Sequence, residues 1–395
     1  MKEPAFLSAL SLTCAAGDGL GPALANLRAG LSPGLKSTES WTPGQALTVG
    51  AVDAVLPDLG SYPLEQRSRN NQLALHNVRQ IETELRQAIE DFGPGRVAVI
   101  VGTTTSGMAE AEAAFQVLHD TGAFPASFVY AQQELGSPAE FLAGAWGIQG
   151  PAYTVSTACS SSAKALAMGR RLLRLGVCDA VLAGGVDTLC RFTLRGFLAL
   201  GALSPDPSLP FKAERKGINI GEAAAFFVMR RDRGPVRLLG VGETSDAYNI
   251  SAPLPEGEGA RDAMQAALRD AGLQAGDIDY VNLHGTGTPQ NDAMEAKAIQ
   301  AVFPQGVPCS STKALTGHTL GAAGALEAGF CWALVSGAVG DTWAPHQAGG
   351  GTVDPELLPL NLLGQGQGLA RAPRRVLSNV FGFGGTNVSL VLGAS

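Results

Sequence analysis

The feature that most constrains this chain is a short, continuous apolar run, Val97–Gly102 (VAVIVG), with helical patterns on both sides. Its residues show no polar alternation, so this strand should be buried on both faces, as inside a layered sheet. Helical spacing is predicted for residues 66–92 before it and 108–121 after it. Strands and helices keep alternating, which predicts an α/β fold. Further strands are expected at residues 5–16, 180–186, 223–229, 236–242, 280–284, 376–380 and 388–392, and further helices at 160–175, 259–271 and 319–339.

The chain is expected to form one compact unit with two halves, residues 1–235 and 236–395, because no linker-like or low-complexity segment interrupts it. Its net charge of −7 and the lack of a basic helix argue against nucleic-acid binding. The apolar stretch 320–339 contains Glu327, which would cost about 2.5–3.5 kcal/mol in lipid, so we expect a buried helix and no membrane insertion. The six cysteines show no CxxC pair and no metal-binding spacing, which predicts reduced thiols and no metal site.

The first candidate site is a cysteine at the junction of a strand-like run and a helix. Residues 154–162 read TVSTACSSS, and Cys159 lies where the helix is expected to begin. The positive end of a helix dipole favours a thiolate, and the small neighbours permit a sharp turn and close approach of a substrate. The segment indicates a nucleophile, with a buried structural cysteine as the alternative.

Two further segments carry histidines in unusual surroundings. His284 follows a hydrophobic run and opens the glycine-rich and hydroxyl-rich segment HGTGTPQND. Lys313 and His318 lie in SSTKALTGHTLGAAGALE, where a buried lysine would be costly without a partner, and Glu327 is the available carboxylate. The simpler interpretations stay open for each segment by itself: a histidine in the core, a solvated lysine and a histidine that caps a helix.

The fourth segment, NVFGFGGTN at residues 379–387, is rich in glycine around Phe383. It lacks the helix and the acidic residue of a dinucleotide fingerprint. Glycines that free backbone N–H groups beside a bulky ring suit an oxyanion hole or a gate. Taken alone, the segment favours a plain tight turn between two strands.

Together, the four segments resemble β-ketoacyl–acyl carrier protein synthases of the elongating, Cys-His-His type. TACSSS, HGTGTPQND, SSTKALTGHTLGAAGALEA and FGFGGTN follow the order of that family, and the resemblance runs through nearly the whole chain. It implies the thiolase fold, in which two similar halves with mixed five-stranded sheets form α-β-α-β-α layers. It also implies a cytoplasmic acyltransferase without metal or nucleotide, because the 4′-phosphopantetheine arm belongs to the acyl carrier protein substrate.

The resemblance assigns roles in a decarboxylative Claisen condensation. Cys159 would take the acyl chain from its carrier, with the backbone N–H groups of Cys159 and Phe383 as the oxyanion hole. His284 and His318 would decarboxylate the malonyl thioester and stabilise the carbanion that attacks the acyl-cysteine.

Other residues have supporting roles by the same resemblance. Lys313, paired with Glu327, would hold the surroundings of the two histidines in place. Thr286 and Thr288 match the hydroxyls that contact the pantetheine arm.

Two departures from the family pattern concern the acyl entrance and the carrier protein. Ile218 stands where the family commonly has Phe at the acyl entrance, beside the gate residue Phe383. The loop that usually carries a carrier-binding arginine reads Pro-Asp-Pro at residues 205–207. We therefore expect substitute cations to form the docking patch: Lys212, Arg215, Lys216, Arg67 and Arg69.

The pathway is suggested by residues 185–204 (GVDTLCRFTLRGFLALGALS) and 217–225 (GINIGEAAA), which are similar to ketosynthases of aryl polyene pigment clusters. Such enzymes lengthen an aryl-primed conjugated chain and can pair with a chain-length partner that lacks the cysteine. Type II fatty-acid elongation is the alternative. We expect a homodimer or a heterodimer with a ketosynthase-like chain-length partner.

Three other members of the wider superfamily fit less well. A non-catalytic chain-length partner would have replaced Cys159, and an initiating synthase would have Asn in place of His318. A degradative thiolase would carry a second cysteine near its C-terminus, and FGFGGTN has none.

Overall fold

The computed structural model describes residues 4–395 and contains one large mixed sheet and a small two-stranded one. The strands are β1 (Phe6–Cys14), β2 (Gly17–Asp18), β3 (Leu35–Thr38), β4 (Leu47–Gly50), β5 (Val97–Gly102), β6 (Ala152–Val155), β7 (Ala180–Asp187), β8 (Ala223–Arg230), β9 (Val236–Ser245), β10 (Tyr280–Asn282), β11 (Pro308–Ser310), β12 (Asn361–Leu362), β13 (Arg375–Gly382) and β14 (Thr386–Ala394). The large sheet follows the order β12-β11-β10-β13-β14-β9-β1-β8-β7-β5-β6, with β2 paired to β1.

This strand order contains the same five-strand pattern twice. In the first group β6, β5 and β7 are parallel, β8 is antiparallel to β7, and β1 is antiparallel to β8. In the second group β11, β10 and β13 are parallel, β14 is antiparallel to β13, and β9 is antiparallel to β14. The prediction of two similar halves with mixed five-stranded sheets is therefore confirmed.

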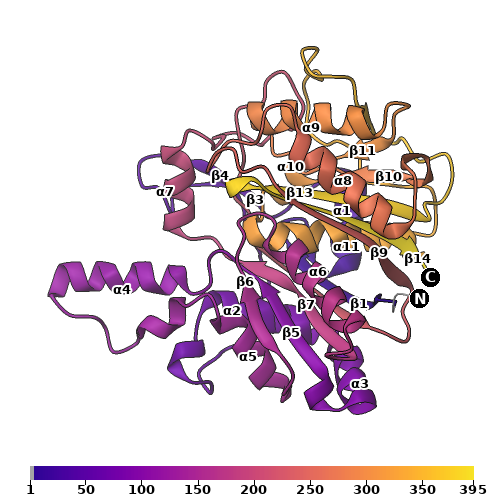
Figure 1. Ribbon diagram of the computed structural model, residues 1–395. Coiled ribbons are helices and arrows are strands. Elements are labelled where there is room, and N and C mark those ends of the chain that lie inside the picture. The colour runs from indigo at the N-terminus through magenta and orange to yellow at the C-terminus, as the bar shows by residue number, and fades with distance from the viewer. Residues whose placement is uncertain (1–3) are drawn as a thin grey trace.

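Helices form three layers around these two groups of strands. The helices are α1 (Leu20–Ala29), α2 (Arg69–Arg79), α3 (Glu82–Phe92), α4 (Met108–Thr121), α5 (Ser137–Trp146), α6 (Ser161–Arg174), α7 (Arg191–Ala199), α8 (Glu258–Ala271), α9 (Pro289–Val302), α10 (Lys313–Thr316) and α11 (Ala323–Val335). Short 3-10 turns are η1 (Leu64–Gln66), η2 (Pro94–Arg96), η3 (Tyr130–Gln133), η4 (Ala275–Asp277), η5 (Leu320–Ala322) and η6 (Phe383–Gly385). Helices α2, α3 and α5 cover the outer face of the first group, and α8 and α9 cover that of the second (Figure 1).

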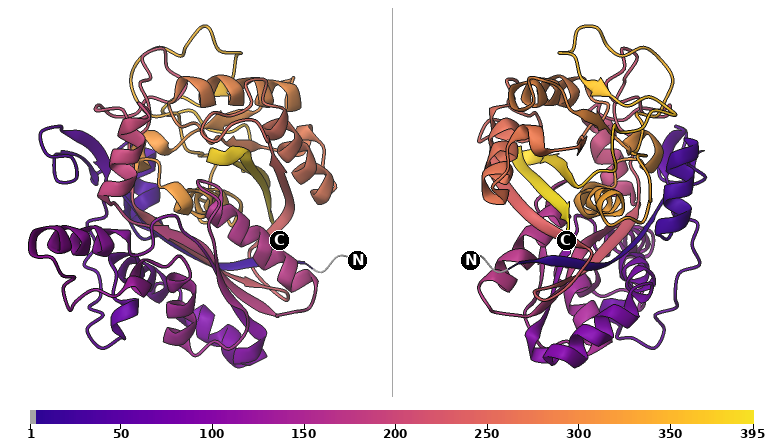
Figure 2. Two further views of the ribbon diagram at one scale, coloured as in Figure 1. Left: turned by 60° about the vertical axis from the view of Figure 1, so that its left-hand side comes forward. Right: turned by 90° about the vertical axis from the view of Figure 1, so that its right-hand side faces the viewer.

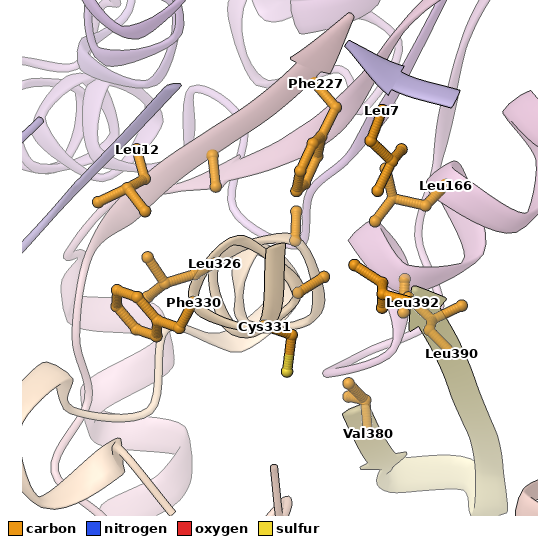
Figure 3. Packing of buried hydrophobic residues seen from close by; sticks show 14 of the residues in the cluster. Leu7, Leu12, Leu166, Phe227, Leu326, Phe330, Cys331, Val380, Leu390 and Leu392 are labelled. Atoms are coloured by element: carbon orange, nitrogen blue, oxygen red, sulfur yellow. The ribbon is translucent and has the colours of Figure 1, made fainter. Parts of the chain in front are cut away.

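Helices α6 and α11 lie between the two groups of strands, which completes the α-β-α-β-α order (Figure 2). Around α11, Leu326 and Phe330 pack with residues of β1, β8 and β14 in one buried cluster (Figure 3). Strand β5 separates this cluster from the outer one, since Ala98 and Ile100 face α6 while Val97, Val99 and Val101 face α2 and α5. The strand is buried along its whole length, as predicted.

Strand β1 joins the two groups. It pairs with β8 from Phe6↔Arg230 to Cys14↔Ala223, and with β9 only at Phe6↔Arg237 and Leu7↔Val236. The division into residues 1–235 and 236–395 stays a prediction, because this strand path is continuous across it.

Two predicted helices are divided in the structure. The helix expected over residues 66–92 is divided into α2 and α3. At the break, the N–H groups of Gln80 and Ile81 donate to the carbonyls of Asn77 and Val78, three residues earlier and not four as in an α-helix. The long helix expected over residues 319–339 is the turn η5 followed by α11, which has 13 residues. Among residues 4–395, no helix is long and apolar enough to cross a membrane.

Candidate active site

Cys159 occupies a sharp turn between β6 and the first residue of α6. Its neighbour Ala158 has a positive φ of 52°, a conformation that non-glycine residues seldom adopt. The Ser161 hydroxyl accepts a hydrogen bond from the Thr157 N–H at 2.9 Å and donates one to the Ala158 carbonyl at 2.6 Å, which holds the turn. The turn places the Cys159 side chain just ahead of the helix, as the sequence predicted.

His284 follows β10 in a loop that is held by the buried side chain of Glu295 on α9. The N–H groups of His284 and Gly285 both donate to Glu295, each at 2.7 Å. Asp292, one turn earlier on α9, accepts from the Gly287 and Phe211 N–H groups at 3.2 and 2.7 Å. These bonds fix the backbone of the Gly-Thr-Gly-Thr segment.

His318 is positioned by the backbone of the Gly-Ile-Asn-Ile-Gly segment. The His318 N–H donates to the Asn219 carbonyl at 2.7 Å, and the Gly221 N–H donates to the His318 carbonyl at 2.9 Å. The segment in which the sequence departs from the family pattern therefore supports a central histidine.

The three predicted reactive side chains come together in the structure. His318 Nε2 lies 3.1 Å from Cys159 Sγ, and the rings of His284 and His318 meet edge to face with centroids 5.3 Å apart. Ligand atoms of all three residues lie within 4.8 Å of one another, and all three are buried.

Both imidazoles are held in the same tautomer by donors at Nδ1. The Leu320 N–H donates to His318 Nδ1 at 3.3 Å, and Lys313 Nζ, an ammonium without a lone pair, lies 3.4 Å from His284 Nδ1. Burial and, secondarily, the charge of Lys313 lower the pKa of both histidines well below 6.5, so both are neutral. Each therefore carries its hydrogen on Nε2, the nitrogen that faces the cysteine or the pocket.

This tautomer also bears on metal binding. A cysteine and two histidines in mutual reach form a candidate metal site by residue type alone. A metal would need the Nε2 lone pair of each histidine, and this would leave hydrogens on Nδ1 facing the Leu320 N–H and the Lys313 ammonium. The donor arrangement suits an incoming oxygen atom better than a metal ion.

Lys313 and Glu327 form a buried ion pair behind the histidines. Lys313 Nζ binds the Glu327 carboxylate and donates to the His284 carbonyl at 2.6 Å. Both side chains are at most 2% exposed, so each charge depends on the other for compensation. The sequence-predicted pairing is confirmed by this contact.

Opposing influences act on the pKa of the Cys159 thiol. Burial raises its pKa to about 11, while the Lys313 charge and hydrogen bonds from the backbone N–H groups of Phe383 and Cys159 act in the opposite direction. The start of α6 and the His318 Nε2–H also favour a negative sulfur. The segment with Phe383 lies close against this turn, since a Cβ atom on Gly382 would come within 3.3 Å of the Cys159 nitrogen.

A pocket of about 170 Å³ opens over the cysteine. For comparison, an apolar cavity of about 150 Å³ holds a benzene molecule. The predicted site residues that line it are Cys159, His284, His318, Thr286, Thr288, Ile218 and Phe383, whereas Lys313 and Glu327 lie behind its wall.

Part of the pocket lining was not predicted from the sequence. Phe197 of α7 packs against Phe383 with ring centroids 5.4 Å apart. Asp246 also lines the pocket and accepts from Asn387 Nδ2 at 2.7 Å. Asn387 and Phe197 lie in segments quoted above but had no role assigned to them, and no local pattern marks Asp246.

Most of the cations expected at a docking patch are already engaged within the chain. Arg69 binds Glu222 at 2.7 Å, Arg215 binds Asp354 at 2.5 Å, and Lys216 binds Asp206 at 3.1 Å. Arg67 donates to the carbonyls of Tyr62 and Gly60 at 2.8 and 2.9 Å.

A buried cysteine beside two neutral histidines, on a five-layered scaffold of two similar halves, defines an acyltransferase of the thiolase-fold class. Known proteins support this class. Residues 61–233 match the family described as "Beta-ketoacyl synthase, N-terminal domain", and residues 236–340 match "Beta-ketoacyl synthase, C-terminal domain".

Relatives agree with the family matches. Nodulation protein E of Rhizobium sp. (strain N33) is 33% identical over 358 residues, 87% of each chain. The 3-oxoacyl-[acyl-carrier-protein] synthase 2 of Rhizobium meliloti (strain 1021) is 40% identical over 264 residues, 62% of this chain and 61% of that protein. A solved structure, the ketosynthase ApeO in complex with its chain length factor ApeC from Xenorhabdus doucetiae, matches with 44% identity and a TM-score of 0.94, covering 100% of this chain and 98% of the matched one. The chain belongs to the β-ketoacyl synthase family.

Proposed function

We propose that this enzyme is an elongating β-ketoacyl–acyl carrier protein synthase that extends an aryl-primed polyene chain by decarboxylative condensation with malonyl carrier protein. The observation that carries the proposal is the contact of 3.1 Å between Cys159 Sγ and His318 Nε2, with His284 beside it. The similarity of residues 185–204 and 217–225 to ketosynthases of aryl polyene pigment clusters favours this pathway over fatty-acid elongation.

In the first half-reaction, the Cys159 sulfur attacks the carbonyl of an acyl thioester and the thiol of the carrier's phosphopantetheine arm leaves. The backbone N–H groups of Cys159 and Phe383 hold the oxyanion of the tetrahedral intermediate. Thr286 and Thr288 contact the arm where it enters the pocket, and Ile218 and Phe383 border the acyl chain. The protein itself needs no cofactor in this step, because the arm arrives with the substrate.

In the second half-reaction, malonyl thioester loses carbon dioxide and an enolate forms. The Nε2–H groups of His284 and His318 donate to the enolate oxygen, a role that suits the tautomer favoured by the contacts at the two Nδ1 atoms. The enolate carbon then attacks the acyl-cysteine carbonyl, the Cys159 thiolate leaves, and the β-ketoacyl carrier is released. Lys313 holds the His284 loop through its bond to the His284 carbonyl.

The partners follow from the same proposal. An acyl carrier protein delivers both substrates, and a chain-length partner of similar fold pairs with this subunit, as in the structure of ApeO with its chain length factor ApeC. A homodimer is the alternative assembly. By family resemblance, we place the reaction in the cytoplasm, without nucleic-acid or membrane partners.

The test is the intact mass of the protein after incubation with aryl-polyenoyl and saturated acyl carriers, with Cys159→Ala as the matched control. We expect a mass increase from aryl-polyenoyl carriers only, and none in the variant. Loading by saturated chains alone would assign the enzyme to fatty-acid elongation. Cys159-independent loading would contradict the proposed mechanism.

A further inference from the structure

Asp187, the last residue of β7, is a fully buried carboxylate that accepts six hydrogen bonds. Its Oδ1 accepts from the Thr103 hydroxyl, the Thr104 N–H, and the N–H and hydroxyl of Thr105, at 2.7 to 3.0 Å. Its Oδ2 accepts from the Thr104 hydroxyl and the Gly321 N–H, each at 2.6 Å. Among residues 4–395 no cation forms an ion pair with this carboxylate, so these hydrogen bonds are what compensates its burial.

These six bonds connect the two halves of the fold next to the pocket. The threonines follow β5 in the first half, whereas Gly321 belongs to η5 in the second. The fit around Gly321 is tight, because a Cβ atom there would lie 2.8 Å from Asp187 Oδ2. The hydrogen bond to Asp187 therefore fixes the position of the Gly321 N–H relative to β5 and β7.

The residue before Gly321 connects this network to His318. Leu320 has a positive φ of 48°, a conformation that costs a non-glycine residue energy and persists only when its surroundings enforce it. In this conformation the Leu320 N–H donates to His318 Nδ1 at 3.3 Å. The opposite tautomer of His318 would place two hydrogens against each other at this contact.

We propose that Asp187 is a positioning residue for condensation: by holding Gly321, it keeps Leu320 in its unfavourable conformation and so fixes the His318 hydrogen on Nε2, toward the substrate. Asp187 does not line the pocket and reaches His318 through this loop. Its charge is also one of the smaller influences that raise the pKa of the Cys159 thiol. The inference rests on the proposed role of His318 in decarboxylation.

The decisive variant is Asp187→Asn, which keeps the size of the side chain but replaces one acceptor oxygen with a donor. In either orientation of the amide, its NH₂ group faces a backbone N–H, either Gly321 or the pair Thr104 and Thr105. Asp179→Asn is the matched control. Asp179 is a buried aspartate just before the start of β7, at the end of the strand away from Asp187, and it pairs with Arg96 and Arg231.

Two quantities are measured for both variants: acyl loading of Cys159 by intact mass, and carbon dioxide release from malonyl carrier. For Asp187→Asn we expect decarboxylation to fall by about 10- to 100-fold, as when a catalytic group is displaced by up to about 1 Å. Loading should stay within about twofold. Asp179→Asn should leave the ratio of the two rates unchanged, and an equal loss of both activities in Asp187→Asn would overturn the positioning role.

A second measurement does not depend on activity, and its main result comes from the wild-type protein. Nitrogen-15 NMR of labelled wild-type protein, with a His318 variant to assign one of its five histidines, reports which ring nitrogen carries the hydrogen. We expect hydrogen on Nε2 in the wild type and a mixture of tautomers in Asp187→Asn. Hydrogen on Nδ1 of wild-type His318 would refute this inference. A wild-type enzyme that shows the expected tautomer but no decarboxylation would instead refute the proposed function.

Discussion

At the scale of single residues, the contact between Cys159 and His318 invites comparison with cysteine–histidine pairs in which the imidazole removes the thiol proton. The direction of the hydrogen bond is different here. Nδ1 of His318 already accepts from the Leu320 N–H, so Nε2 faces the sulfur with a hydrogen. In the proposed mechanism, His318 therefore stabilises negative charge, first on sulfur and then on the enolate oxygen.

We therefore expect His318→Ala to separate the two half-reactions. Acyl loading of Cys159 should persist within about tenfold, since the oxyanion hole is made of backbone N–H groups, whereas carbon dioxide release from malonyl carrier should be abolished. Both are measured by intact mass and by gas release. His346→Ala, which changes a buried histidine outside the pocket, serves as control. Normal decarboxylation in His318→Ala would contradict the assigned role.

The sequence predicted candidate reactive residues, but it did not predict the hydrogen-bond partners of the two histidine rings. Cys159, His284 and His318 stand in motifs whose residue types suit the chemistry, and the structure brings them together. The tautomer of His318 depends on Leu320 and Asp187, which are far apart in sequence, and no local pattern connects them. Distant partners of this kind appear only once the two halves are packed.

At the scale of elements, α10 and α11 are joined by the buried ion pair between Lys313 and Glu327, and we expect this pair to contribute to stability. Glu327→Leu should lower the free energy of unfolding by about 3–5 kcal/mol, because the Lys313 charge stays buried without its carboxylate. The double variant Lys313→Met/Glu327→Leu should recover most of that loss, while decarboxylation stays impaired. Denaturant unfolding measures the first effect and gas release the second.

A matched exposed pair provides the control for this prediction. Lys36 and Asp53 form an ion pair at 2.6 Å whose side chains are 47% and 61% exposed. Asp53→Leu should change the free energy of unfolding by no more than about 1 kcal/mol. A similarly small effect for Glu327→Leu would show that the buried pair is not needed for stability.

Elements were predicted best where local pattern and burial agree. Residues 97–102 form β5 with the predicted limits, because a fully buried parallel strand leaves a continuous apolar run. The predicted strand at residues 280–284 ends earlier, at Asn282. The N–H groups of His284 and Gly285 donate to Glu295 and so are not available to a neighbouring strand. The break between α2 and α3 was missed because neither Gly nor Pro marks it.

At the scale of the whole molecule, buried titratable groups should make stability depend on pH with a maximum near pH 6–7. Burial raises the pKa of Glu295 from 4.5 to about 8, so the folded protein keeps a proton that the unfolded chain releases, and stability falls as pH rises across this range. Burial lowers the pKa of His284 and His318 below 6.5, so the unfolded chain binds more protons below that pH and stability falls there too.

Thermal unfolding between pH 5 and 8.5 tests this expectation. Above pH 6.5 the Glu295 contribution should reduce stability by at most about 1.4 kcal/mol per pH unit. Glu295→Gln should flatten this part of the curve relative to its own maximum. A wild-type Tm that rises steadily from pH 6.5 to pH 8 would contradict the prediction.

The pairing of β1 with β8 has a consequence for synthesis in the cell. Phe6 pairs with Arg230, so more than 200 further residues must be synthesised after β1 before its partner strand β8 is complete. At a translation rate of 5–20 residues per second, this synthesis lasts roughly 10–45 s. During this time the apolar side chains of β1 are without their final neighbours, which makes the emerging chain a candidate client for chaperones that shield nascent strands.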